Sequence, residues 1–236
     1  MTTGHPSALA LQTLFRDERL WAVEKPSGML VHRGWGDDDV VVVDLIRAAL
    51  GKAPHPVHRL DRGTSGVLLF ALDERAARAM GERFERGEVD KRYLALVRGR
   101  APDEGWIDHP LPRKEGGPRV ASASWFRRLA SAAAEPRELS LVEVRPRTGR
   151  PHQVRRHMKH IGHPLIGDAN YGKGPLNRAI RDRYGLARLA LHAVELAFDH
   201  PFTEQRVEVR APLPDDLSRP LARMGLEVSA LEVSAL

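Results

Sequence analysis

The order of strand-like and helix-like segments constrains the fold of this chain more than any other feature of its sequence. Strand patterns outnumber helix patterns, and the two kinds do not alternate regularly. Regular alternation would predict a doubly wound parallel sheet, so this order favours an α+β fold. We expect strands at residues 20–23, 67–71, 91–99, 119–129, 138–145, 188–198 and 206–210, and helices at 40–50, 74–86, 152–161 and 177–184.

Residues that cap or end helices support these boundaries. Asp73 can accept a hydrogen bond at the start of the second helix, and Gly51 and Gly87 follow the first two helices, where a left-handed residue is favoured. Pro151 suits the first turn of the third helix, which we expect to end at Gly162. We expect an extended path at 29–32, loops at 34–39 and 163–173, and loop or short strands at 100–118.

The domain organisation is simple, because no low-complexity linker divides the 236 residues. We expect one main domain over residues 18–224, with a weakly patterned lead-in at 1–17 and a tail at 225–236. The tail contains a short direct repeat, in which the five residues at 227–231 recur at 232–236. We expect no function for this repeat, because chain ends commonly fray.

The composition excludes several classes of chemistry. The chain contains no cysteine, which rules out disulfides, thiolate metal sites and cysteine nucleophiles. It has neither a Gly-rich loop ending in Gly-Lys-Ser/Thr nor a dinucleotide-binding fingerprint after a first strand. Neither a signal peptide nor an apolar run of membrane-spanning length is present, so we expect a cytoplasmic protein with no membrane partner.

Positive charge is concentrated in one stretch of the chain. Overall, 37 Lys and Arg stand against 31 Asp and Glu, yet residues 145–167 contain no acidic residue. Arg150 and His152 are among the Arg, Lys and His residues of this stretch. Such a patch typically faces a polyanion, first of all nucleic acid, and the alternative is a solvated basic helix face. The histidines suit phosphate and 2′-hydroxyl contacts better than zinc, because no Glu lies among them and their neighbours are cationic.

A candidate catalytic carboxylate lies in the segment His58-Arg59-Leu60-Asp61-Arg62-Gly63-Thr64-Ser65-Gly66. Arg59 and Arg62 flank Asp61 and favour its ionised form, and such a carboxylate can attack an electrophilic sugar carbon. The alternative is a surface ion pair that closes a turn before the expected strand. Tyr93 is either a core residue or a ring on which a base stacks. By themselves, these residues support RNA binding and leave RNA modification open.

The Asp61 segment resembles the catalytic motif of the RluA-type pseudouridine synthases, which isomerise uridine in RNA. Further segments resemble the same family in the same order, and the resemblance spans roughly residues 18–200. Several ordered motifs are far more specific than any one alone. The further segments are Lys25-Pro26-Ser27-Gly28 with Val31-His32, Lys91-Arg92-Tyr93-Leu94-Ala95, Arg147-Thr148-Gly149-Arg150-Pro151-His152-Gln153-Val154-Arg155, His163-Pro164-Leu165-Ile166-Gly167-Asp168 with Tyr171-Gly172, and Leu191-His192-Ala193.

This resemblance implies a fold and a set of residue roles. The family fold is a single α+β catalytic domain with a bent, mostly antiparallel mixed sheet flanked by helices and a cleft across its middle. Asp61 matches the catalytic aspartate, Arg155 the basic residue paired with it, and Tyr93 the tyrosine that stacks on the flipped uracil. Arg59 matches a residue that helps to displace the target base, and Leu191 an apolar residue that lines the pocket.

The implied reaction needs no cofactor, because nothing is oxidised or hydrolysed. Asp61 would attack or deprotonate the ribose near C1′, and the sequence leaves both roles open. We expect the distant Arg155 to set the charge of Asp61 more than either neighbouring arginine does.

The implied substrate is tRNA. Residues 167–174, 177–178 and 188–193 resemble the TruC-like branch of the family, which modifies a uridine in the T-stem of tRNA, at position 65. Only about seventeen residues precede the first expected strand, too few for the S4-like module of many relatives that act on ribosomal RNA. We therefore expect a monomeric tRNA enzyme with no protein partner. The alternatives are a ribosomal RNA substrate or a non-catalytic RNA-binding protein.

Overall fold

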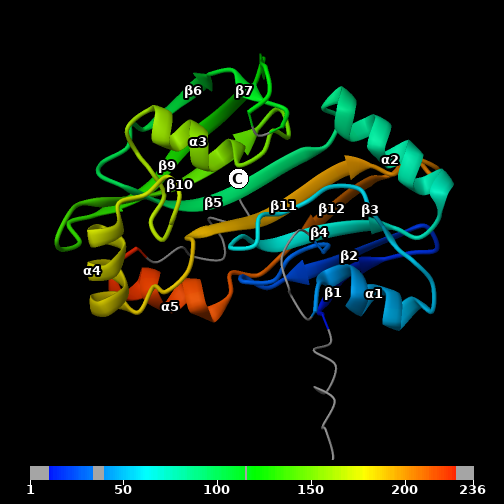
Figure 1. Ribbon diagram of the computed structural model, residues 1–236, viewed down its shortest axis with the longest axis horizontal. Helices are drawn as coiled ribbons and strands as arrows, with labels where there is room; N and C mark the ends of the chain where they lie inside the picture. The colour runs from blue at the N-terminus through cyan, green and yellow to red at the C-terminus, as the bar shows by residue number, and fades with distance from the viewer. Residues whose placement is uncertain (1–10, 34–39, 115, 227–236) are drawn as a thin grey trace, which may run out of the picture. The chain divides into compact units, whose positions relative to one another are not determined.

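The computed structural model describes residues 11–33, 40–114 and 116–226 of the chain (Figure 1). The expected loop at 34–39, the repeat at 227–236 and the first ten residues of the lead-in lie outside these ranges. The chain divides into two compact units, one made of residues 1–90 with 193–211 and the other of 91–192 with 212–236. Each unit has its own hydrophobic core.

The first unit is built on a sheet in which β2 pairs with both β1 and β4, and β12 pairs with β11, all antiparallel. The short β3 pairs with β4, and β11 lies next to β4. Every residue of β4 is buried, which confirms the buried strand predicted at 67–71. The strands are β1 (Thr13–Arg16), β2 (Leu20–Lys25), β3 (His55–Pro56), β4 (Ser65–Ala71), β11 (Leu191–Asp199, of which Ala193 onward belongs to this unit) and β12 (Arg206–Arg210).

Two helices of the first unit form as the sequence predicts. α1 (Val42–Leu50) ends at Gly51 and α2 (Glu74–Arg86) ends at Gly87, and both glycines have left-handed φ angles, of 69° and 73°. Asp73 caps α2 by accepting a hydrogen bond of 2.9 Å from the backbone N–H of Ala76. The apolar face of α2 then joins the same hydrophobic core as β2 and β4.

The second unit contains an antiparallel sheet with the strand order β5-β10-β9-β6, and β7 pairs separately with β8. Val154 and Met158 of α3 pack into a core with apolar side chains of β5 and β10. Figure 1 shows α4 and α5 beside each other in this unit. The elements are β5 (Asp90–Arg98), β6 (Glu104–Asp108), β7 (Leu111–Pro112), β8 (Arg119–Val120), β9 (Ala123–Ala132), β10 (Leu139–Pro146), α3 (Gln153–His160), α4 (Gly174–Tyr184) and α5 (Asp215–Arg223).

Antiparallel strands that do not alternate regularly with helices confirm the α+β prediction. The bend of the sheet and a cleft across its middle stay predictions, as does the single domain at 18–224. Across the parts of the chain that the structure describes, no helix is both long enough and apolar enough to cross a membrane.

Two elements form where the sequence predicts neither a strand nor a helix, because tertiary packing outweighs weak local patterns. β1 forms inside the expected lead-in, where pairing with β2 supplies its hydrogen bonds. α5 forms after the last predicted strand, and it contains Pro220 in its interior. Burial of Leu217 and Leu221 on one face stabilises α5 despite that proline.

Three further boundaries were predicted wrongly. α4 begins at Gly174 and not at 177, because Pro175 fits the first turn of a helix. β11 begins at Leu191 and not at 188, because the backbone groups of Ala190 bond to other segments, its N–H to the carbonyl of Ile166 at 3.0 Å. The strand expected at 119–129 is divided into β8 at Arg119–Val120 and β9 at Ala123–Ala132.

Gly66 allows a close approach of two backbones in the first unit. Its φ is 116°, a conformation that residues with side chains rarely adopt. A Cβ atom at this position would lie 2.1 Å from the carbonyl oxygen of Ala193 on β11. Any side chain here would therefore push β4 away from its neighbour.

We expect Gly66→Ala to lower the free energy of unfolding by roughly 3 kcal/mol, because it adds both steric overlap and backbone strain. Urea denaturation measures the change. Gly81→Ala is the matched control, since Gly81 lies inside α2 and a Cβ there meets no atom within 4 Å. That control should raise stability by about 0.5–1 kcal/mol. Equal stabilities for the two variants would contradict the steric argument.

Candidate active site

The loop that carries Asp61 lies directly before β4 in the first unit. Asp61 is half-buried, and its carbonyl oxygen accepts a hydrogen bond of 3.0 Å from the backbone N–H of Thr64, which closes a turn. Leu60 and Thr64 on either side are buried. The loop is therefore attached to the core at both sides of the carboxylate.

Lys25 fixes this loop from the neighbouring strand. Its side chain is completely buried, yet its ammonium group donates hydrogen bonds to the carbonyl oxygens of Pro26 at 2.9 Å, Met29 at 2.6 Å and Arg62 at 3.1 Å. A buried cation is tolerated only where such partners replace water. The residue after Asp61 is thus tied to the turn that follows β2.

Two further hydrogen bonds join the same turn to the Asp61 loop. The hydroxyl of Ser27 donates to the carbonyl of Gly63 at 2.8 Å, and the backbone N–H of Gly28 donates to the carbonyl of Arg62 at 2.8 Å. The left-handed φ of 88° at Gly28 suits such a tight turn. The Lys25-Pro26-Ser27-Gly28 motif therefore acts as a support for the loop that follows His58.

His58 anchors the start of the loop. Its Nε2 accepts a hydrogen bond of 3.0 Å from the backbone N–H of Leu69 on β4, and its ring stacks on Phe84 of α2 at 5.1 Å between centroids. The assignment of Nε2 as acceptor follows from the N–H that faces it. His58 therefore has a structural role in this motif.

Arg59 differs from its neighbours in the motif. Its side chain is exposed, and it makes no hydrogen bond or ion pair with any residue that the structure describes. Within those residues, the alternative of a surface ion pair between Arg59 and Asp61 is therefore not observed. The guanidinium of Arg59 is accessible to solvent.

Arg155 is the central cation of the second unit. It lies on α3, nine-tenths buried, and forms a two-point ion pair with Asp168, Nε to Oδ2 at 2.8 Å and Nη2 to Oδ1 at 2.9 Å. This fork geometry is the strong form of an arginine–carboxylate pair. Its orientation is therefore set by a carboxylate 13 residues along the chain.

Asp168 is itself held by the loop that follows α3. Its Oδ1 also accepts hydrogen bonds from the backbone N–H groups of Asn170 and Tyr171, both at 3.0 Å. Burial by itself would raise the pKa of Asp168, but the hydrogen bonds from Arg155 and Tyr171 outweigh it, so the pKa lies below its ordinary value. Asp168 therefore stays ionised at neutral pH.

Tyr171 connects this ion pair to His152. The guanidinium of Arg155 lies 5.1 Å from the centroid of the Tyr171 ring, and the ammonium group of Lys159 lies 5.5 Å from it. The hydroxyl of Tyr171 is 3.1 Å from Nδ1 of His152. His152 has a left-handed φ of 54°, which is uncommon for a residue with a side chain. The structure thus brings the predicted residues His152 and Arg155 together around one ring.

The other predicted residues of the second unit lie on neighbouring elements. Tyr93, on β5, is half-buried at the edge of the hydrophobic core that contains Leu191. Leu191 is almost fully buried as the first residue of β11. Arg150 precedes α3, and its backbone N–H donates to the side-chain oxygen of Gln153 at 3.0 Å. Asp61 and Arg59 belong to the first unit.

The remaining histidines of the basic stretch do not all face solvent, as RNA contacts would require. His157 is fully buried and lies 2.9 Å from the hydroxyl of Ser124 and 3.0 Å from the carbonyl of His109. His160 stacks on His109 at 3.7 Å between ring centroids, and His163 contacts the carbonyl of Arg98 at 2.8 Å. For His157, the prediction of a phosphate or 2′-hydroxyl contact is wrong, because this side chain lies on the face of α3 that packs into the protein.

Comparison with known protein families decides the class of protein. Residues 19–160 match the family described as RNA pseudouridylate synthase. The chain belongs to this family. It is therefore a pseudouridine synthase, an isomerase, which confirms the RluA-type resemblance of its motifs.

Individual relatives match this pseudouridine synthase over most of its length. It is 42% identical over 223 residues to tRNA pseudouridine synthase C of Haemophilus ducreyi, covering 87% of this chain and 92% of that protein. It is 39% identical over 242 residues to tRNA pseudouridine synthase C of Vibrio cholerae, covering 94% and 98%.

Two solved structures have a similar fold. One is human RNA pseudouridylate synthase domain containing 4, with a TM-score of 0.75, 26% identity, and coverage of 92% of this chain and 94% of that one. The other is human RNA pseudouridylate synthase domain containing 1, with a TM-score of 0.73, 29% identity, and coverage of 91% and 87%.

The sequence patterns of this pseudouridine synthase did not reveal that Asp168 orients Arg155 or that Lys25 holds the Asp61 loop. Asp168 was noted only as part of a motif, although it is the first acidic residue after the acid-free stretch. That position was the one available sign of a partner for Arg155. Lys25 left no comparable sign, because its burial depends on the fold of residues 26–29 and 62.

We expect Asp168→Asn to lower the free energy of unfolding by about 3 kcal/mol, because it removes the carboxylate partner of a buried guanidinium. It should also reduce kcat, because Arg155 loses its fixed orientation. Asp215→Asn is the matched control, since Asp215 and its partner Arg219 are both more than two-thirds exposed. That control should cost less than about 1 kcal/mol. Denaturation and turnover measure both effects, and small, equal losses would contradict the assignment.

The buried His157 makes stability depend on pH. Burial lowers the pKa of His157, and burial followed by repulsion from His160 lowers the pKa of His109. The unfolded chain then binds more protons than the folded one below about pH 6.5, so stability falls as pH falls. The lowered pKa of Asp168 acts only below about pH 4 and does not affect this range.

We expect the free energy of unfolding to fall between pH 7.5 and pH 5 in the wild-type protein. His157→Gln should weaken this dependence, because glutamine keeps a hydrogen-bonding group but does not titrate. Urea denaturation at both pH values measures the difference. An unchanged pH dependence in the variant would show that His157 does not carry the effect.

Proposed function

We propose that this pseudouridine synthase acts on tRNA, at a uridine of the T-stem, in the cytoplasm. The observation that carries the proposal is the identity of 42% and 39%, over most of both chains, to proteins named tRNA pseudouridine synthase C. The acid-free basic stretch at 145–167 supports a polyanionic substrate. We assign the activity to residues 18–224 as one catalytic domain.

Base extrusion is the first step that the proposal requires. A uridine in a stem hides its glycosidic bond, and turning it out costs roughly a few kcal/mol. We assign Arg59 to the space that the base leaves, since this exposed guanidinium has no ion-pair partner among the described residues. We assign Tyr93 to stacking on the extruded uracil, because its ring is only half-buried at the edge of the core.

We assign the chemical step to Asp61. Its carboxylate would attack C1′ or remove a proton from the ribose, so that the bond from C1′ to N1 breaks and a bond from C1′ to C5 forms. The proton on C5 then leaves and N1 gains one, while the carboxylate is released from C1′ or returns the ribose proton, so that the product is an isomer of uridine. We propose that Arg155, held in place by Asp168, pairs with the carboxylate of Asp61 in the active enzyme. The isomerisation changes no oxidation state, so the proposal includes no cofactor.

Three residues complete the proposed substrate contacts. Leu191 would form the apolar wall beside the uracil, consistent with its place in the core next to Tyr93. Arg150 and His152 would contact the RNA backbone, since they lie half-buried just before α3. The link from His152 to Tyr171 would keep that imidazole in place.

We expect the wild-type protein to release tritium from tRNA that carries C5-labelled uridine, and to release none from labelled ribosomal RNA. Asp61→Asn should abolish release, by at least about 10³-fold, because amide and carboxylate have similar shapes but different chemistry. Its affinity for tRNA should change little. Retained turnover in this variant would contradict the role of Asp61.

The control is Asp44→Asn, a carboxylate of the same unit that pairs with Arg33 at 2.8 Å. It should keep near wild-type turnover. Release from ribosomal RNA alone would show that the proposed substrate is wrong while the family assignment holds.

A further inference from the structure

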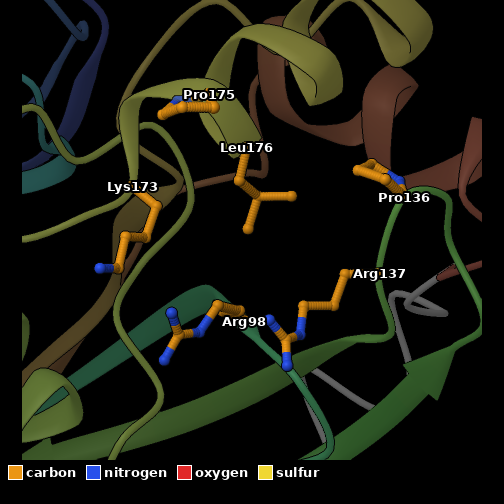
Figure 2. A pocket seen from close by; sticks show the side chains of 6 residues that line it. All are labelled: Arg98, Pro136, Arg137, Lys173, Pro175 and Leu176. Carbon is orange, nitrogen blue, oxygen red and sulfur yellow. The ribbon is translucent and has the colours of Figure 1, made fainter.

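A pocket of about 400 Å³ lies in the second unit, and its lining includes none of the residues assigned to the reaction. It combines three cationic side chains with an apolar remainder, and Figure 2 shows the cations arranged around Leu176. Several of its residues are exposed, so the pocket opens to solvent. Its lining consists of Arg98, Pro136, Arg137, Lys173, Pro175 and Leu176.

Within the part of the chain that the structure describes, no carboxylate pairs with the three cations of this pocket. The side chains of Arg137 and Lys173 make no hydrogen bond or ion pair with any residue in the described ranges 11–33, 40–114 and 116–226. Arg98 donates one hydrogen bond, of 3.1 Å, to the carbonyl oxygen of Gly162. Like charges gathered without a carboxylate raise each other's free energy, which an incoming anion would relieve.

The two acidic residues that flank Pro136 and Arg137 in the sequence are paired with arginines outside the pocket. Glu135 pairs with Arg183 at 3.0 Å, and Glu138 lies 3.6 Å from Arg100. Neither pair includes a cation of the pocket. The loop of Pro136 and Arg137 therefore presents positive charge, although acidic residues flank it in the sequence.

The walls of the pocket are held in place by hydrogen bonds. The backbone N–H of Glu135 donates to the hydroxyl of Tyr184 on α4 at 3.1 Å, which ties the loop to that helix. The carbonyl oxygen of Glu138 accepts a hydrogen bond of 2.7 Å from the backbone N–H of Gly99, which connects the loop to the end of β5. This loop is therefore already ordered before a ligand binds, which lowers the entropy cost of binding.

The start of α4 adds to the positive potential. Lys173 is the N-cap of this helix, and the first turn contains neither an acidic residue nor a side-chain cap. The backbone N–H groups at a helix start carry partial positive charge. Three cations and this helix end together select for an anion, and arginine suits phosphate oxygens in particular.

We propose that this pocket binds backbone phosphates of the substrate RNA and anchors it at a distance from the target uridine. Arg98 lies five residues beyond Tyr93 on β5, roughly 16 Å along the strand. That span corresponds to roughly five stacked nucleotides of one strand. The inference rests on the proposed function, because it takes the substrate to be RNA.

The test compares two triple variants with the wild-type full-length chain. The pocket variant is Arg98→Gln, Arg137→Gln and Lys173→Gln. The control variant is Arg78→Gln, Arg86→Gln and Arg219→Gln, which removes the same charge from exposed arginines that pair with neighbouring carboxylates. Binding of tRNA is measured at several salt concentrations, and kcat and KM are measured on the same tRNA.

The pocket variant should bind tRNA at least about tenfold more weakly at low salt, and the slope of log K against log salt should fall by about one per lost contact. Its KM should rise while kcat at saturating tRNA stays unchanged, because the pocket does not touch the reacting atoms. The control variant should change little. Should the triple variant fail to fold, Arg137→Gln alone, at an exposed side chain without partners among the described residues, should still lower the slope by about one.

Other outcomes would overturn the proposal. Equal affinity and salt slope in the pocket and control variants would show that the pocket does not contact RNA. Wild-type binding of inorganic phosphate that the pocket variant loses, with tRNA affinity unchanged, would identify a site for a small anion instead. A wild-type protein that modifies no tRNA would overturn the proposed function, a result visible before any variant is made.

Discussion

The ion pair between Arg155 and Asp168 organises the second unit, because both charged groups are buried and each needs the other. Removing two ions from water costs several kcal/mol per ion, and only good geometry with further hydrogen bonds offsets that cost. Here the fork geometry and the backbone N–H groups of Asn170 and Tyr171 provide it. Helix α3 and the loop after it are consequently fixed against one another, and with them His152 and the ring of Tyr171.

The first unit uses a related device with a different partner. Lys25 is buried against three backbone carbonyls, and these bonds, with those of Ser27 and Gly28, hold the turn beside Asp61. In both units, a buried cation donates its hydrogen bonds to groups of the protein, and these bonds position a loop. By contrast, Arg59 and the cations of the pocket at Arg98 are accessible, and accessible cations are the ones that can meet RNA phosphates and bases.

Much of the fold followed from local patterns. β4, α2 and the ends of α1 and α2 were predicted correctly, because a continuous apolar run, an Asp cap and C-terminal glycines act within a few residues. β1 and α5 were missed, since each depends on contacts with distant segments more than on its own pattern. The same holds for the candidate site. Its motifs could be recognised in the sequence, whereas the contacts by which Lys25 holds the Asp61 loop and Asp168 holds Arg155 could not.

Residue identity and short spacing were enough to predict the family, the α+β class, the helix ends and the residues that the family motifs single out. Three features became visible only in the folded chain: the burial of His157, the pairing of Asp168 with Arg155, and the pocket that Arg98, Arg137 and Lys173 share. The physical reason is that burial and pairing of charges are settled by packing between segments far apart in the chain, which no local pattern encodes.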